Sequence, residues 1–200
     1  MSNSSATPSP PPAAPEATPP STPHLRLTRA SSAYVCVGGF ISIGAVAAIA
    51  LLSGSTFIFP SLGATAFLQL YVPQAPVASP RNTILGHACG IVGGAIALLV
   101  TGLWALPHVG ANHMSWQHVL AAALSMAISG GLMSKFSVGH PAAAATALIV
   151  SLGLIDTLQG VVLIEVAVVL LTAIIYVTNH LAGVKFPLWA APAPGAHLAK

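Results

Sequence analysis

Long apolar segments with almost no charged residues constrain the fold of this chain more than any other feature. At about 1.5 Å of rise per residue, a helix of about 20 residues crosses the hydrocarbon of a bilayer. Four segments approach or exceed this length: residues 34–52, 83–106, 118–134 and 161–181. Charged residues make up only 4% of the chain, against about 25% in soluble domains. So few charges cannot cover a surface that faces water, and we therefore expect an all-α polytopic membrane protein.

Two further apolar segments, 60–72 and 140–154, are too short for ordinary spans. The same pattern, Pro-x-x-(Gly/Ala)-Ala-Thr-Ala, begins at Pro60 in the first segment and at Pro141 in the second. Proline is favoured in the first turn of a helix, and a helix of about twelve residues is only about 18 Å long. We therefore expect each segment to form a short, broken helix within the membrane.

The order of the segments repeats along the chain. Residues 34–106 and 118–182 each contain a full span, an extended stretch, a short helix opened by proline and another full span. Each unit then crosses the membrane three times, so the second unit is inverted relative to the first. We expect two inverted repeats with about six crossings, two of them half-helices, an arrangement typical of transporters. Residues 1–30, rich in Pro, Ser and Ala, are expected to be a disordered tail, and residues 191–200 a second tail.

Basic residues favour six crossings over four. With the N-terminus in the cytoplasm, six crossings place every Lys and Arg on the cytoplasmic side, as the positive-inside rule requires: Arg26, Arg29, Arg81, Lys135, Lys185 and Lys200. In the four-span alternative the short segments do not cross, and Arg81 and Lys135 move outside. We therefore expect a multi-pass protein of the bacterial inner membrane, embedded in the lipid bilayer, with both termini in the cytoplasm.

Several function classes are disfavoured by composition and spacing. A net charge of +3 is not the dense basic face that nucleic acid requires. Cys36 and Cys89 lie in apolar segments and form neither a disulfide framework nor a metal-binding spacing. His108, His113 and His118 do not match a zinc pattern, and we place them in a solvated loop. Without paired carboxylates or a Ser/His/Asp set, we expect no enzyme, no cofactor and no metal.

Two short helices that enter from opposite faces would bring their starts together near the membrane midplane. A helix start exposes unpaired N–H groups and about half a positive charge, so it attracts anions. Hydroxyl-bearing, small and helix-starting residues of both segments fit one anion site: Ser61, Gly63, Thr65, Pro141, Ala142, Ala143 and Thr146. His140 immediately precedes the second helix and can donate to the anion or take a proton. The structural alternative is that the prolines only start helices and the small residues only pack them.

Other polar residues of the spans also allow two interpretations. Arg81 begins the third segment, either as an interfacial anchor or as an attractor of anions at the entrance, and Asn82 is a good N-cap. His87, about one turn further on, either faces the anion site or is a hydrogen-bonded core residue. Glu165 lies inside the last span, where a charge is a functional hypothesis, here proton coupling, unless it reaches water by snorkelling.

The order of these motifs resembles the HPP family of small integral membrane proteins over roughly residues 34–189. The resemblance is carried by Leu62-Gly63-Ala64-Thr65-Ala66, Ala78-Ser79-Pro80-Arg81-Asn82, Gly86-His87, His140-Pro141 with Ala145-Thr146-Ala147, and Phe186-Pro187-Leu188-Trp189. The chain departs from the family pattern at Ala142, where the family carries a second proline, and at Ala144, which is usually glycine. The resemblance implies nitrite transport, the role assigned to plastid and cyanobacterial relatives, and brings Leu62 and Asn82 into the substrate-binding set.

We therefore predict a membrane transporter or channel for a small inorganic anion, with nitrite as the leading substrate. Nitrite is a small planar monoanion, which suits a site built from the backbone amides of two helix starts. A homo-oligomer is compatible with the sequence. The alternative from another class is a membrane scaffold or sensor module that transports nothing.

Overall fold

The computed structural model describes residues 31–55, 58–105, 114–155 and 157–191. Within these residues every regular element is helical, which confirms the predicted all-α class. The elements are α1 (Ser32–Ser53), α2 (Pro60–Tyr71), η1 (Pro76–Ala78), α3 (Pro80–Val100), η2 (Leu103–Ala105), α4 (Trp116–Lys135), α5 (Ala143–Ser151) and α6 (Leu158–Leu181). Among them α1, α3 and α6 are long and apolar enough to cross a membrane. The predicted tails, 1–30 and most of 191–200, lie outside the described residues.

Two predicted helix starts are displaced in the structure. Helix α3 begins at Pro80, and its N-cap is Ser79 rather than Asn82, because the Ser79 hydroxyl accepts from the Asn82 backbone N–H at 3.4 Å. Proline at the first helical position makes this start favourable. Helix α5 begins at Ala143 rather than Pro141, since the two residues before it form a turn.

The fourth predicted span is present as α4, although its helix is not among the three that are apolar enough to span by composition alone. Its sequence carries Ser125, Ser129 and Ser134 along the helix and His118 in the first turn. The hydroxyls of Ser125 and Ser129 donate to carbonyls of the preceding turn of the same helix. Such internal bonds satisfy hydroxyls in an apolar environment.

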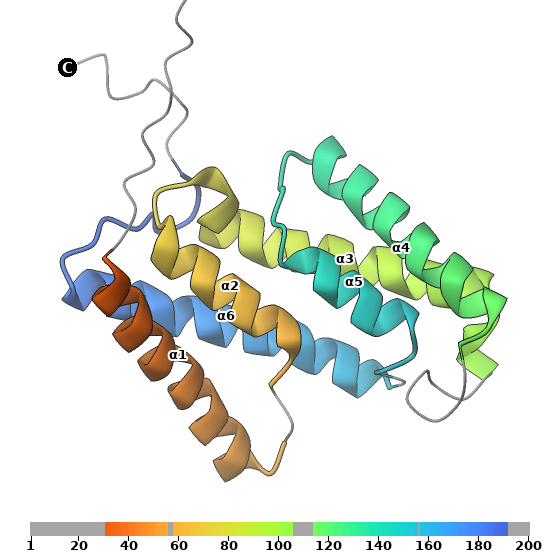
Figure 1. The fold of residues 1–200 in the computed structure, drawn as a ribbon, viewed down its shortest axis with the longest axis horizontal. Helices are drawn as coiled ribbons and strands as arrows, with labels where there is room; N and C mark the ends of the chain where they lie inside the picture. The colour runs from red at the N-terminus through yellow and green to blue at the C-terminus, as the bar shows by residue number, and fades with distance from the viewer. Residues whose placement is uncertain (1–30, 56–57, 106–113, 156, 192–200) are drawn as a thin grey trace, which may run out of the picture.

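The six α-helices divide into two groups around the antiparallel pair α3 and α6 (Figure 1). Helices α1 and α2 pack against α6, and α4 and α5 pack against α3. Helices α2 and α5 both begin near the middle of the molecule and run toward opposite ends. The first turns of the two short helices therefore face the centre of the bundle.

Three glycines of α3, spaced four residues apart, allow α5 to pack against its backbone. A Cβ at Gly90 would lie 2.6 Å from the Ala143 carbonyl oxygen, and a Cβ at Gly94 would lie 2.7 Å from that of Ala147. At Gly86 the added atom would lie 2.7 Å from the His140 Cβ. Small residues at this spacing permit close helix contact in membranes, so this seam fixes His140 and α5 against α3.

An apolar core lies mainly between α2 and α6. It includes Leu62, Leu70, Ile164, Val168, Leu171 and Ile175. Large apolar side chains also point outward, as at Phe40, Leu51 and Leu52, each more than 80% exposed. Such exposure is costly in water and is the expected condition of a lipid-facing helix.

Candidate functional site

Eight polar side chains meet in the middle of this apolar bundle, each 4% exposed or less. They are Ser61, Thr65 and Gln69 from α2, Thr83 and His87 from α3, His140 from the segment before α5, Thr146 from α5 and Thr172 from α6. We call this group the polar cluster. It contains five of the predicted substrate-binding residues, Ser61, Thr65, His87, His140 and Thr146. Buried polar groups are costly unless they are hydrogen-bonded, so their partners define what the cluster can do.

Helical spacing explains why these side chains meet. Ser61, Thr65 and Gln69 are four residues apart and therefore lie on one face of α2. Thr83 and His87 have the same spacing on α3. The first turns of α2 and α5 are adjacent, since Thr65 on α2 lies within hydrogen-bonding distance of His140.

The hydrogen bonds of His140 fix its tautomer. Its Nδ1 lies 2.7 Å from the carbonyl oxygen of Val77, and because a carbonyl only accepts, Nδ1 carries the hydrogen. In a neutral ring Nε2 is then an acceptor. The Thr65 hydroxyl oxygen lies 3.1 Å from this Nε2 and 2.9 Å from the Ser61 carbonyl oxygen, so its single hydrogen has two acceptors within reach. We assign this hydrogen to His140 in the neutral state, because Nε2 has no other described donor. This assignment is inferred from the geometry of the partners.

The direction of the Thr65 hydrogen bond determines the directions of the two hydrogen bonds of His87. The His87 Nε2 lies 3.0 Å from the Thr65 hydroxyl oxygen, whose hydrogen is directed to His140, so His87 Nε2–H donates to Thr65. The His87 Nδ1 is then an acceptor, and the Thr146 hydroxyl donates to it at 2.8 Å. The donors therefore run in one direction, Thr146 to His87 to Thr65 to His140 to the Val77 carbonyl. We call this series the His–Thr chain; it links α5, α3, α2 and η1.

A second layer of bonds surrounds Gln69. Its amide nitrogen lies 3.0 Å from the Thr83 hydroxyl and 3.3 Å from that of Thr172, which ties α2 to α3 and α6. Two polar atoms of the polar cluster have no partner among the described residues, the Ser61 hydroxyl and the Gln69 side-chain oxygen. The Ser61 side chain is fully buried, so its unpartnered hydroxyl has no contact with solvent either.

Backbone amides at the two helix starts are less available than the sequence suggested. In α5 the N–H groups of Ala143, Ala144 and Ala145 donate to carbonyl groups three residues earlier, at 3.0, 3.1 and 3.2 Å. The Leu62 N–H donates likewise to Phe59 at 2.9 Å. Turns of this kind satisfy donors that an abrupt helix start leaves free. The polar surface at the centre is therefore supplied mainly by side chains.

Several predicted site residues lie beside the polar cluster rather than in it. Leu62 belongs to the apolar core. Ala142 and Ala143 are buried, and Ala143 packs against the glycine seam of α3. Gly63 and Pro141 are exposed. In this conformation these five residues shape the surroundings of the polar cluster without presenting polar side chains to it.

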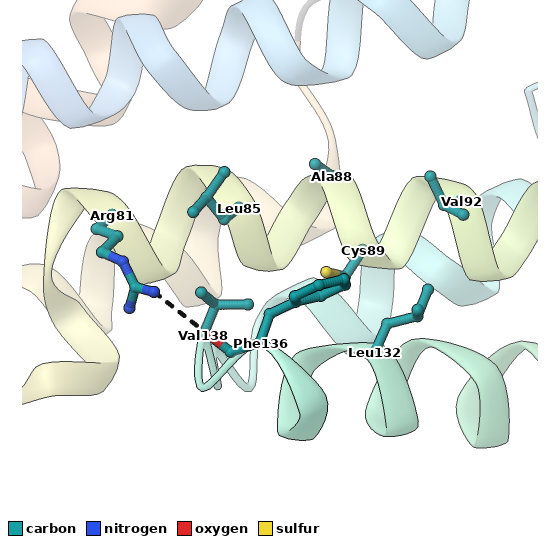
Figure 2. Close-up of a pocket in the computed structure, with 8 residues that line it drawn as sticks. All are labelled: Arg81, Leu85, Ala88, Cys89, Val92, Leu132, Phe136 and Val138. Carbon is teal, nitrogen blue, oxygen red and sulfur yellow. Dashed lines mark hydrogen bonds between the residues drawn. The ribbon is translucent and has the colours of Figure 1, made fainter.

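Arg81 and Asn82 hold the segment that carries His140. The Arg81 guanidinium donates to the carbonyls of Phe136 and Ser137 at 3.3 and 3.1 Å, and the Asn82 amide donates to that of Gly139 at 3.3 Å. Arg81 lies at one end of an apolar groove of about 410 Å³ between α3 and α4 (Figure 2). The groove is lined by Arg81, Leu85, Ala88, Cys89, Val92, Leu132, Phe136 and Val138. Arg81 therefore holds the segment between α4 and α5 in place and lies outside the polar cluster.

Three members of the polar cluster were not predicted from the sequence: Gln69, Thr83 and Thr172. A signal for the first two was present, since Gln69 continues the four-residue spacing of Ser61 and Thr65, and Thr83 precedes His87 by four. Thr172 is a single hydroxyl in a long apolar helix, so nothing in its local sequence distinguishes it. No sequence signal indicates that the Val77 carbonyl accepts from His140, because this contact is set by the tertiary fold alone.

Two other polar residues differ in role from the polar cluster. His118, predicted to lie in a solvated loop, is 4% exposed and caps α4, because its Nδ1 accepts from the Ser115 backbone N–H at 3.1 Å. His108 and His113 lie outside the described residues. Both carboxylate oxygens of Glu165 on α6 are buried without a partner among the described residues. Within that part of the chain no three His, Cys, Asp or Glu side chains gather as a metal site.

A bundle of long apolar helices around buried, bonded polar side chains defines an all-helical integral membrane protein. A family model for the transmembrane region of HPP proteins matches residues 24–187, and the chain belongs to this family. A transmembrane protein of Dictyostelium discoideum is 31% identical over 134 residues, which cover 64% of this chain and 44% of that protein. The chain therefore matches less than half the length of this curated relative. No solved structure matches the chain significantly.

Proposed function

We propose that this protein is a membrane transporter or channel for a small inorganic anion, with nitrite as the leading substrate. The observation that carries the proposal is the polar cluster itself. Eight buried polar side chains from five segments converge in an apolar bundle, where polar residues are expensive and usually functional. Four of them, Ser61, Thr65, His140 and Thr146, lie in or next to the first two turns of the short helices, the position at which transporters with broken helices bind their substrates.

The course of the helices supports two inverted repeats. In Figure 1, α1 and α3 run toward one end of the molecule, and α4 and α6 run toward the other. The short helices α2 and α5 begin at the centre and run to opposite ends. We therefore propose that the unit of α1, α2 and α3 has an inverted counterpart in α4, α5 and α6, with α2 and α5 as the half-helices.

Three basic residues support the proposed topology. The guanidinium of Arg81 bonds the carbonyl of Phe136, which follows Lys135, and the Arg81 backbone N–H donates to Trp189, four residues after Lys185. The backbones at Arg81, Lys135 and Lys185 are thus brought to one end of the bundle. We place this end on the cytoplasmic side of a bacterial inner membrane, in accordance with the positive-inside rule.

An anion that enters the polar cluster would lose its hydration water and would bind hydroxyl and imidazole donors in its place. The Ser61 hydroxyl is buried and unpartnered, whereas a donor of Thr65, His87 or His140 would have to give up a bond within the His–Thr chain to reach a ligand. Every member of the polar cluster is closed off from the surface, and in the proposed transport cycle we assign this conformation to an occluded state. Access from either side then requires the α1–α2 and α4–α5 groups to move relative to each other, the rocking motion of repeat-based transporters.

Anion flux into liposomes that contain only the full chain tests this function. We expect uptake of nitrite above the rate in protein-free vesicles, and slower or no uptake of larger anions such as sulfate. The measurement uses a panel of nitrite, nitrate, chloride, formate and sulfate at pH 8, where little nitrous acid is present to cross lipid unaided. A panel in which no anion moves faster than in protein-free vesicles overturns the transport proposal and favours a scaffold or sensor.

A further inference from the structure

We propose that the His–Thr chain binds a single proton, which crosses the membrane together with the anion, so that the protein is an electroneutral proton–anion symporter. The inference rests on the proposed anion transport and adds the coupling ion, its binding atom and the stoichiometry.

The neutral His–Thr chain has one basic atom that can take a proton without losing a bond. This atom is Nε2 of His140, which accepts from the Thr65 hydroxyl at 3.1 Å. When a proton binds to its lone pair, Nε2–H becomes a donor to the Thr65 oxygen, and Nδ1–H continues to donate to Val77. The displaced Thr65 hydrogen has an acceptor in place, the Ser61 carbonyl oxygen at 2.9 Å.

Thr65 is fully used in this protonated state. Its oxygen accepts from Nε2–H of both histidines and its hydrogen donates to the Ser61 carbonyl, which matches the two acceptor positions and one donor of a hydroxyl. The only rearrangement is the rotation of one O–H bond. Thr65 is therefore the switch between the neutral and the protonated chain, and a side chain of the same shape without the hydroxyl cannot perform it.

The His–Thr chain also provides a route for the proton from His87. A proton that arrives at Nδ1 of His87, in place of the bond from Thr146, allows Nε2–H to pass to the Thr65 oxygen as the Thr65 hydrogen passes to His140. One proton enters and one stays on His140, so the atoms and charges balance. This transfer leaves His87 neutral with its hydrogen on Nδ1 and a bare Nε2, which then accepts from the Thr65 hydroxyl. His87 holds a proton less well than His140, because its Nδ1 faces the Thr146 hydroxyl, which would have to stop donating and has no other described acceptor.

The His–Thr chain does not hold two protons at once. The two rings lie with their centroids 5.1 Å apart, so two imidazolium ions would repel each other in a region of low dielectric. The packed elements offer little compensation: α2 has no ionisable side chain other than Tyr71, and η1 and α5 have none. The remaining described groups are Arg81 and Cys89 on α3, Glu165, Tyr176 and His180 on α6, Lys185 after α6, His118 and Lys135 on α4, and Tyr34 and Cys36 on α1. The described hydrogen bonds and ion pairs place no carboxylate on either histidine.

A single monovalent anion supplies the missing countercharge. The polar cluster is then neutral when it is empty and neutral when it holds one proton and one anion. Either form can change its exposure between the two sides without moving net charge through the bilayer, whereas the anion or the proton alone would carry a charge and its desolvation cost. The buried, unpartnered hydroxyl of Ser61, one turn before Thr65, provides a donor for the anion next to the proton site.

The test measures anion accumulation in liposomes under separate pH and electrical gradients. Nitrite and nitrate serve as probes, and the values from protein-free vesicles are subtracted. With the outside one pH unit more acid, we expect about tenfold accumulation inside, since one pH unit is a factor of ten in proton activity. A potassium-diffusion potential of either sign is expected to leave the flux unchanged. Thr65→Val should lose the response to the pH gradient, and Thr65→Ser should recover a measurable part of it.

The outcomes separate this inference from the transport proposal. Wild-type flux that follows the electrical potential and ignores the pH gradient overturns proton coupling while anion transport stands. The absence of flux for every probe overturns both. If Thr65→Val does not fold, as judged by its thermal unfolding in detergent, the wild-type comparison of the two gradients decides alone. A Thr65→Val protein that folds and accumulates anion in full response to the pH gradient overturns the role of the His–Thr chain.

Discussion

Replacement of Gly90 by valine is expected to prevent recovery of folded protein. The Cβ of any residue at this position would lie 2.6 Å from the carbonyl oxygen of Ala143 and 3.4 Å from the backbone nitrogen of Ala147. These contacts are with backbone, which cannot move aside as a flexible side chain can, so α5 must separate from α3. Overpacking of an interior commonly costs about 1–3 kcal/mol, and we expect the upper end or more. Thermal unfolding in detergent and the yield of monodisperse protein measure the effect.

Gly131→Val provides the matched control for this substitution. Gly131 lies within α4, is exposed, and has no atom within 4 Å of the position where a Cβ would be added. Both variants introduce the same β-branched residue into a helix, so they share its small propensity change. A drop in unfolding temperature confined to Gly90→Val attributes the loss to the α3–α5 contact. Equal drops in both variants would show that the close approach at Gly90 does not matter.

The sequence was sufficient for the class of protein and for the position of the two short helices. Scarce charge and long apolar runs predict membrane helices, because a helix satisfies its own backbone hydrogen bonds and can expose apolar side chains to lipid. The prolines at 60 and 141 and the shared Thr-Ala ending correctly located short helices at α2 and α5. The predicted helix ends were less accurate. At the start of α3, Ser79 and Asn82 are both residue types that favour the N-cap position, so the sequence did not decide between them.

The composition of the candidate site was only partly predictable. Helix-start electrostatics led to an expectation of free backbone amides, yet the first N–H groups of α5 donate within their own turn. Whether an amide is free depends on two or three dihedral angles that sequence does not specify. The side chains of Thr65, His87 and His140 were expected near one another, but their order in the His–Thr chain depends on the Val77 carbonyl, a contact between residues 63 positions apart.

His140→Gln is expected to abolish proton-stimulated anion uptake while the protein stays folded. The amide of glutamine can donate to the Val77 carbonyl and accept from Thr65, so the buried partners of His140 are not left unsatisfied, which would cost about 1–3 kcal/mol each. Glutamine cannot hold a proton, however. We therefore expect a change in stability of about 1 kcal/mol or less, together with uptake close to that of protein-free vesicles under an inward proton gradient.

The control for this variant is His180→Gln, since His180 is exposed at the end of α6 and stacked on Tyr176, about two helical turns beyond Thr172, the member of the polar cluster on this helix. It should retain both stability and uptake. Unfolding temperature and initial uptake rate, measured on the same preparations, separate a structural defect from a functional one. If His140→Gln unfolds at the wild-type temperature and takes up anion at the wild-type rate, His140 is not a proton site. Because the electroneutral cotransport of proton and anion is assigned to this one imidazole, such a result would remove the proton coupling and would leave anion transport to be judged from the flux measurements alone.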